Sequence, residues 1–111
     1  MSAWNSNGLT VRTTAATSDT VLATDDAVVY TAATAKTVSL PSAALSTTQL
    51  GKVYRFVNAA AGTVTITPTA GLIDGAANKV MATAPTAATP GCLTIVSDGT
   101  NWRSLSYTVG A

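Results

Sequence analysis

The chain has 111 residues, of which 10% are charged and 47% apolar, with a formal net charge of +1 and neither histidine nor glutamate. This length suits a single domain with one modest core. The missing histidine excludes Ser-His-Asp and Cys-His catalysis and His-based zinc sites, and the six scattered basic residues provide no positive stripe for nucleic acid, so we expect neither an enzyme nor a nucleic-acid binder.

The N-terminal segment differs from the rest of the chain. Residues 1–8 show no hydrophobic period, and we interpret them as an N-terminal arm that precedes a single β-domain over 9–111. Trp4 lies among polar residues there, and a tryptophan in such a segment usually buries its ring. Trp4, Asn5 and Asn7 are therefore candidates for contact with a partner molecule; the alternative is a frayed end.

Short runs rich in β-branched residues, each closed by Gly, Pro, Asn or Asp, predict strands along the remaining chain. Apolar and hydroxyl residues alternate within several of these runs, which is typical of antiparallel strands with one face in the core. The pairs expected on the core face are Val38 and Leu40, Val64 and Ile66, and Leu93 and Ile95. The fold class that we expect is all-β, a single compact antiparallel β-sandwich or barrel of the jelly-roll type. We expect strands near residues 9–14, 20–23, 27–31, 36–40, 52–58, 63–67, 79–83, 92–97 and 102–108.

The connections carry their own signals. We interpret the segment between Asn58 and Gly62 as a hairpin loop that joins the strands at 52–58 and 63–67. Residues 42–51 are expected to hold one helical turn that ends at Gly51. Asp98-Gly99 is a strong signal for a hairpin turn, and we expect Trp102 to pack over that hairpin with its indole N–H on a carbonyl.

Two kinds of ligand site need separate consideration. All five aspartates stand beside turn signals, where Asp caps its own backbone; calcium at Asp25 and Asp26, or at Asp98 with Asn101, stays open as an alternative without a known calcium-loop pattern. A threonine run at 63–67 would suit an ice-binding face only if it recurred at a fixed spacing, which the sequence lacks. We therefore assign no metal and no cofactor.

The aromatic residues and the single cysteine are expected to be structural. A carbohydrate site would need exposed aromatic rings, whereas Tyr30, Tyr54, Phe56 and Tyr107 lie in predicted strands, where packing is the expectation. Cys92 is expected to be a small buried hydrophobic residue of a chain made in a reducing cytoplasm. No apolar run is long enough for a membrane helix, and the N-terminus does not resemble a secretory signal.

Three segments together resemble a known family. Residues 38–43 (VSLPSA), 51–75 (GKVYRFVNAAAGTVTITPTAGLIDG) and 93–102 (LTIVSDGTNW) resemble a small β-domain that recurs in bacteriophage head-decoration, head-fibre and tail-fibre proteins. Residues 1–27 fall outside the pattern, and the loop at 84–91 is longer than expected. The family-like positions, which we interpret as fold-determining turns, are Pro41, Gly51, Gly62, Asp74, Gly75, Asp98, Gly99 and Trp102.

The resemblance implies a structural role without catalytic residues, in an all-β domain that is often trimeric and attached to a capsid or tail. The chain has neither a heptad stem nor collagen-like repeats, which favours a capsid decoration (cement) protein over a long fibre. We expect a homotrimer that bridges capsomers of the major capsid protein at the virion surface, without nucleic acid or membrane. The alternative is a head-fibre or tail-fibre component involved in host attachment.

Overall fold

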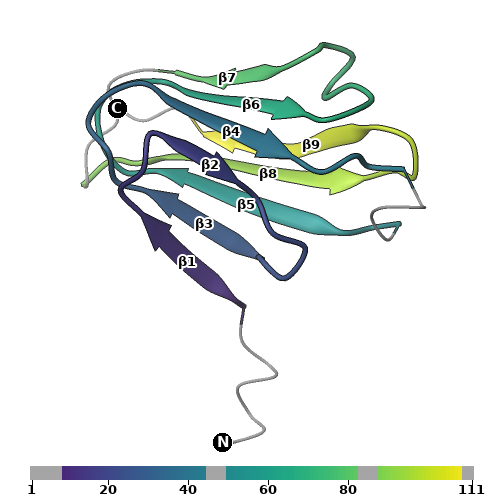
Figure 1. The fold of residues 1–111 in the computed structure, drawn as a ribbon, viewed down its shortest axis with the longest axis horizontal. Helices are drawn as coiled ribbons and strands as arrows, with labels where there is room; N and C mark the ends of the chain where they lie inside the picture. The colour runs from purple at the N-terminus through teal and green to yellow at the C-terminus, as the bar shows by residue number, and fades with distance from the viewer. Residues whose placement is uncertain (1–8, 45–49, 83–87, 109–111) are drawn as a thin grey trace, which may run out of the picture.

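A computed structural model describes residues 9–44, 50–82 and 88–108 of the chain. The described part is all-β, with a five-stranded sheet in the order β1-β3-β5-β8-β9 and a four-stranded sheet in the order β2-β4-β6-β7 (Figure 1). The strands are β1 (Val11–Thr14), β2 (Ser18–Thr20), β3 (Ala27–Tyr30), β4 (Lys36–Leu40), β5 (Val53–Asn58), β6 (Val64–Pro68), β7 (Lys79–Met81), β8 (Gly91–Ser97) and β9 (Trp102–Thr108).

The first six strands alternate between the two sheets. Strands β1, β3 and β5 are parallel neighbours in the five-stranded sheet, and β2, β4 and β6 are parallel neighbours in the four-stranded sheet. Each consecutive pair of strands therefore forms one turn of a coil, and three such turns are stacked along the molecule (Figure 1). Strands β7, β8 and β9 then add antiparallel pairs at the other end.

The expected antiparallel pairing is therefore wrong for the four pairs formed among the first six strands, although β5 and β6 also pair antiparallel with β8 and β7. Neither sheet closes into a barrel. The expected hairpin between β5 and β6 is also wrong, because these strands lie in different sheets and residues 59–63 cross between them. Gly62 in this crossing has φ +91°, and a Cβ there would lie 2.5 Å from the carbonyl carbon of Thr34. Alternation identifies the buried face of a strand, but it does not say which way the neighbouring strand runs.

Strand positions agree more closely with the sequence. The strands at 36–40 and 102–108 have the expected bounds, and most others differ by one or two residues at an end. Strand β2 is the largest departure, since it spans Ser18–Thr20 instead of 20–23. The expected arm at 1–8 lies outside the described residues, as does 45–49 within the expected helical turn.

The core lies between the two sheets and confirms the predicted inward positions. A chain of aromatic rings crosses it: Tyr30, Phe56, Tyr54 and Trp102 follow one another with ring centroids 6.4, 6.2 and 5.4 Å apart. The Trp102 indole Nε1 donates to the carbonyl oxygen of Pro41 at 2.9 Å, which confirms the expected indole hydrogen bond. The residues predicted on the core face are all at most 2% exposed, namely Val38 and Leu40, Val64 and Ile66, and Leu93 and Ile95.

The β8–β9 hairpin confirms the turn predicted at Asp98-Gly99. The Asp98 Oδ1 atom accepts hydrogen bonds from the backbone N–H groups of Thr100 at 3.0 Å and Asn101 at 2.8 Å, and Gly99 has φ +96°. The hydrogen bonds from the Asn101 N–H, then from the Arg103 side chain and then from the Thr100 N–H, lower the pKa of Asp98 to about 2. The carboxylate therefore stabilises the turn as an acceptor, which is the turn interpretation of this residue.

Candidate functional site

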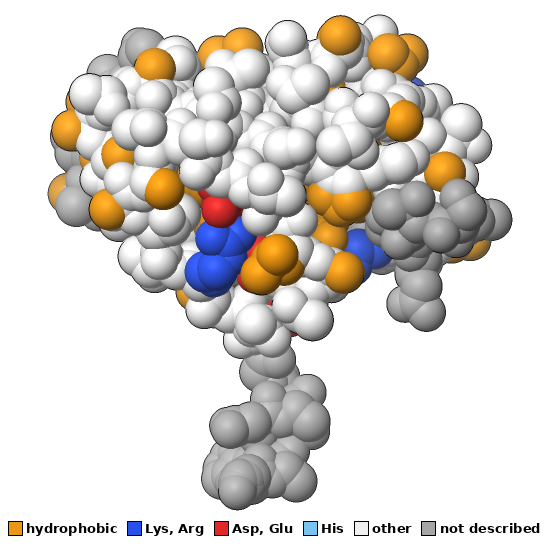
Figure 2. Space-filling model, viewed as in Figure 1, with side chains coloured by type: hydrophobic (Ala, Val, Ile, Leu, Met, Phe, Trp, Pro, Cys, Tyr) orange, Lys and Arg blue, Asp and Glu red, His pale blue; other side chains and the backbone are white. Residues whose placement is uncertain are grey.

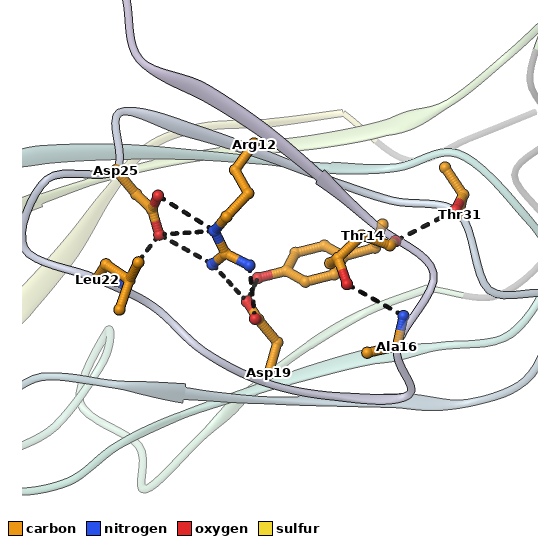
Figure 3. A network of polar contacts seen from close by, with 8 residues as sticks. Arg12, Thr14, Ala16, Asp19, Leu22, Asp25 and Thr31 are labelled. Atoms are coloured by element: carbon orange, nitrogen blue, oxygen red, sulfur yellow. Dashed lines mark hydrogen bonds and ion pairs between the residues drawn. The ribbon is translucent and has the colours of Figure 1, made fainter.

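The outermost layer of the core, at the end formed by β1 and β2, is polar. Arg12 on β1 and Asp19 on β2 occupy inward positions, in register with Val28 and Val38 on the next strands of their sheets. The Arg12–Asp19 ion pair therefore occupies positions that are filled by Val28 and Val38 on the next strands, β3 and β4. Asp25, in the connection between β2 and β3, completes the cluster (Figure 3).

One guanidinium bridges the two carboxylates in this cluster. Arg12 Nη1 and Nη2 donate to the two Asp19 oxygens at 2.8 and 2.9 Å, and Nη2 also donates to Asp25 Oδ2 at 2.9 Å (Figure 3). The Tyr30 hydroxyl donates to Asp19 Oδ2 at 2.9 Å, and the Leu22 backbone N–H donates to Asp25 Oδ2 at 2.9 Å. The side chains of Arg12, Asp19 and Asp25 are 28%, 10% and 3% exposed.

The electrostatics follow from these contacts. Hydrogen bonds from Arg12 lower the pKa of Asp19 below its usual value. Burial alone would raise the pKa of Asp25, but the donors Arg12 and Leu22 outweigh it and the net pKa is lowered. Burial first, and then the hydrogen bond to Asp19, raises the pKa of Tyr30. Both aspartates thus stay ionised at neutral pH, and their oxygens are committed to protein donors.

Few oxygen lone pairs of Asp25 remain for a cation, although Asp25 and Asp26 were the alternative calcium position. The neighbouring Asp26 accepts from the Thr10 backbone N–H at 2.8 Å and pairs with Lys52 Nζ at 3.4 Å. In residues 9–44, 50–82 and 88–108, no group of three or more acidic, cysteine or histidine side chains is arranged to hold a metal ion. We interpret the Arg12 cluster as a polar cap on the open end of the stacked coil, comparable to the polar terminal caps of repeat proteins.

The outward side of the four-stranded sheet is covered by hydroxyl groups. Ser18, Thr37 and Thr65 form one row across β2, β4 and β6, and Val80 continues this row on β7. A second row crosses the same three strands. We define the hydroxyl face as these six outward residues, Ser18, Thr20, Thr37, Ser39, Thr65 and Thr67.

The hydroxyl face carries no charged side chain. Figure 2 shows mostly white atoms over β2, β4 and β6, while blue and red atoms gather below β2. A shallow depression of about 260 Å³ lies on this side of the molecule. Its lining is made by Ser18, Asp19, Thr20, Thr37, Val38, Ser39, Thr67, Pro68 and Thr69.

The outward side of the five-stranded sheet has a different chemistry. Val29 and Val57 stand in one row with Cys92, and two arginines, Arg55 and Arg103, lie among the outward positions. Cys92 was expected in the core, but it is a free thiol that is partly exposed on this outer side. We define the valine face as the outward residues Val11, Val29, Val53, Val57, Cys92 and Val96.

The structure places the sequence-predicted residues at separate points. Trp4, Asn5 and Asn7 lie outside the described residues. Asp74 has φ 51°, and its Oδ1 accepts from the Ser104 backbone N–H at 2.8 Å, while Ser104 Oγ and Lys79 Nζ donate to its Oδ2. Gly51 and Gly75 both have φ +80°, in the left-handed region that glycine adopts without strain.

A comparison with models of protein families and with curated proteins found no match to this chain. The described residues include no helix with the length and apolar character needed to cross a membrane. The features that the structure assembles are thus the polar cap around Arg12 and two outer faces of contrasting chemistry. Sequence reasoning predicted outward hydroxyl groups on single strands, but it missed how the strands join them into a face, because the neighbouring strands were not known.

Proposed function

We propose that this chain is a virion structural protein, a capsid decoration (cement) protein that forms a homotrimer and stabilises a phage head by bridging capsomers. The observation that supports this proposal is the valine face, where apolar side chains point away from the core. Figure 1 shows the two sheets one over the other, and we propose that they form a sandwich with an N-terminal arm. Apolar outward rows on a sheet are typical of association surfaces.

The size of the valine face indicates how it would be used. The whole outward side of the five-stranded sheet, of which the valine face is a part, measures roughly 400 Å², from five strands ~4.8 Å apart with about five residues each at ~3.3 Å. A stable interface buries about 800 Å² per partner, so this side supplies at most about half of that area. A copy would therefore need a second contact, from the arm that carries Trp4 or from several subunits acting together.

The arginines on the outward side of the five-stranded sheet indicate the charge of a partner surface that would fit it. Arg103 pairs with Asp98 at 2.9 Å, whereas Arg55 is exposed and has no ion pair among the described residues. An unpaired arginine beside an apolar face is a good anchor, because arginine is enriched in interfaces and pairs with carboxylates through two hydrogen bonds. We infer a partner surface that is apolar with an acidic group opposite Arg55.

The test compares matched aspartate substitutions on the two faces. Val57→Asp places a charge in the valine face, and Thr65→Asp places the same charge in the hydroxyl face as the control. We expect light scattering to show a trimer for the unmodified chain and for Thr65→Asp, with loss of the trimer in Val57→Asp. Sedimentation with undecorated phage heads would report capsid binding by the same three proteins. A clean monomer that also fails to bind capsids would overturn the proposal.

The alternative, a head-fibre or tail-fibre component involved in host attachment, differs in copy number. A cement protein is present in hundreds of copies per particle, and a fibre component in tens or fewer. Quantifying the chain in purified virions therefore separates the two. The hydroxyl face is the feature that favours a role in attachment, because a decoration protein needs no second ligand-binding surface.

A further inference from the structure

We propose that the hydroxyl face is a binding site for a neutral carbohydrate chain. This inference goes beyond the structural role proposed above and does not depend on it, because it concerns the opposite sheet. It rests on three properties of this face: in-register rows of hydroxyl groups, an uncharged surface, and the depression that lies over β2, β4 and β6.

The first property is the regular spacing of donors and acceptors. Strands β2, β4 and β6 are parallel, so equivalent hydroxyls recur every ~4.8 Å across the sheet and every ~6.6 Å along each strand. The Thr37 hydroxyl approaches the Thr17 carbonyl oxygen at 3.5 Å, a long contact. The hydroxyls of Ser18, Thr20, Ser39, Thr65 and Thr67 make no hydrogen bond within the described part of the chain. They are therefore available to a ligand as donors and as acceptors.

The second property is neutrality, which selects the class of ligand. The lining contains no lysine or arginine, so a phosphate, sulfate or carboxylate would lack a counter-charge. Asp19 is the one ionisable residue in the lining, and its carboxylate is held by Arg12 at 2.8 Å and by the Tyr30 hydroxyl at 2.9 Å. A ligand that both donates and accepts hydrogen bonds and carries no charge is the complement of this surface, and sugars without acidic groups meet that description.

The third property is shape. The depression holds about 260 Å³ and is lined by strand residues from three neighbouring strands, with Thr69 just beyond β6. That volume is slightly below the range of ordinary small-molecule sites, and the exposed lining combines hydroxyl groups with a larger apolar share, as such sites usually do. A flat ice lattice would not fill a hollow, whereas a chain of one or two sugar rings would. The shape therefore favours a carbohydrate over ordered water.

No aromatic residue lines this depression within the described part of the chain, so the ring stacking that we expected of a carbohydrate site is absent here. Affinity would depend on hydrogen bonds that replace bonds to water. Each of these contributes little in net terms, and we expect a dissociation constant on the order of 1 mM for a single copy. Several copies on one particle would raise the effective affinity by multivalency. A weak site of this kind is detectable by chemical-shift mapping even where calorimetry fails.

The experiment uses the full chain labelled with ¹⁵N, titrated with maltohexaose and, separately, with cellohexaose. We expect shifts confined to residues 18–20, 37–39 and 65–69. Heparin hexasaccharide serves as the anionic control and is expected to leave these residues unmoved. The double variant Thr37→Val and Thr67→Val keeps the β-branched shape but removes two hydroxyls, and we expect it to bind about tenfold more weakly.

A matched control keeps this test independent of folding. Thr13→Val and Thr94→Val make the same change on the outward side of the five-stranded sheet, and binding is expected to be unchanged. Three results would overturn the proposal: no shift with either neutral oligosaccharide at 10-fold the expected dissociation constant, equal binding by the Thr37 and Thr67 variant, or shaping of ice crystals without carbohydrate binding. Loss of capsid attachment in Val57→Asp does not bear on this outcome, so the two proposals fail separately.

Discussion

The two outer faces of this molecule lie on similar strands but differ in side-chain chemistry, with valines, a thiol and two nearby arginines on one and hydroxyl groups on the other. Val57 on the five-stranded sheet and Thr65 on the four-stranded sheet occupy equivalent outward positions, and both are β-branched residues that favour strands. Exchanging a methyl for a hydroxyl leaves the strand almost unaffected and changes what its surface binds. Outward positions are therefore free to specify partners, while the inward positions maintain the fold that both faces share.

The largest expected effect comes from breaking the core that supports both faces at once. Trp102 is fully buried, contacts Tyr54 and donates to the Pro41 carbonyl. Trp102→Ala is expected to lower the free energy of unfolding by about 3–5 kcal/mol, because it leaves a large cavity. Urea denaturation followed by circular dichroism measures this loss. Trp102→Phe restores most of the volume without the indole hydrogen bond and should be intermediate; equal stability of all three proteins would refute the role of the ring.

The next largest loss of stability is expected from removing Arg12, which caps the open end of the stacked coil beside the hydroxyl face. Arg12→Ala leaves Asp19 and Asp25 facing each other without a cation, and we expect about 2–3 kcal/mol of destabilisation, somewhat less than for a fully buried pair. Thermal denaturation with matched buffers provides the measurement. Arg103→Ala, which removes a more exposed ion pair with Asp98, is the control and should leave the midpoint nearly unchanged. A similar midpoint shift in both variants would contradict the capping role of Arg12.

A smaller loss of stability is expected at acidic pH. The pKa values of Asp19 and Asp25 are lowered in the folded state, so the folded protein binds fewer protons than the unfolded chain. The stability that these groups contribute is present above their unfolded pKa of about 4 and is lost as the pH falls through the folded values. Urea midpoints between pH 2 and pH 7 would show this decline. Asp19→Asn should flatten it, and an unchanged slope in that variant would count against the assignment.

The smallest change in stability is expected when the side-chain chemistry of the valine face and the hydroxyl face is exchanged. Exchanging the two chemistries by Val57→Thr and Thr65→Val is expected to change the free energy of unfolding by less than about 0.5 kcal/mol for each substitution. Self-association should weaken in Val57→Thr and strengthen in Thr65→Val, which sedimentation velocity would report. If both substitutions leave association unchanged, the difference between the faces has no role in assembly.

Particular residues show how far the sequence could predict this structure. Alternation identified the inward side of Val38, Val64 and Leu93, because a period of two depends only on local backbone geometry. It could not reveal that β5 and β6 lie in different sheets, since this depends on the path of the crossing at 59–63. Strand positions were therefore predictable, while strand directions were not.

The candidate sites were harder to predict for the same reason. Ser18, Thr37 and Thr65 form one row, yet they are separated by 19 and then 28 residues, so no fixed period marks them in the sequence. Arg12 and Asp19 are close in sequence, but their pairing requires β1 and β2 to lie in opposite sheets. Cys92 was predicted in the core from its residue type, although alternation with the inward Leu93 places it on the outer side.

The stacked coil also sets an order in which the molecule assembles itself. Ser97 and Trp102 pair across the short turn of the β8–β9 hairpin. Val28 and Phe56 are register partners separated by 28 residues of chain, and Arg12 and Val28 are separated by 16. Closing a longer loop costs more chain entropy, so we expect the β8–β9 hairpin to nucleate folding. Strand β1 has a neighbour on one side only, at the edge of the five-stranded sheet, so we expect the turn that holds Arg12 to be the first to unwind. Amide hydrogen exchange should then show protection that falls from β8 through β5 and β3 to β1, and uniform protection would contradict this order.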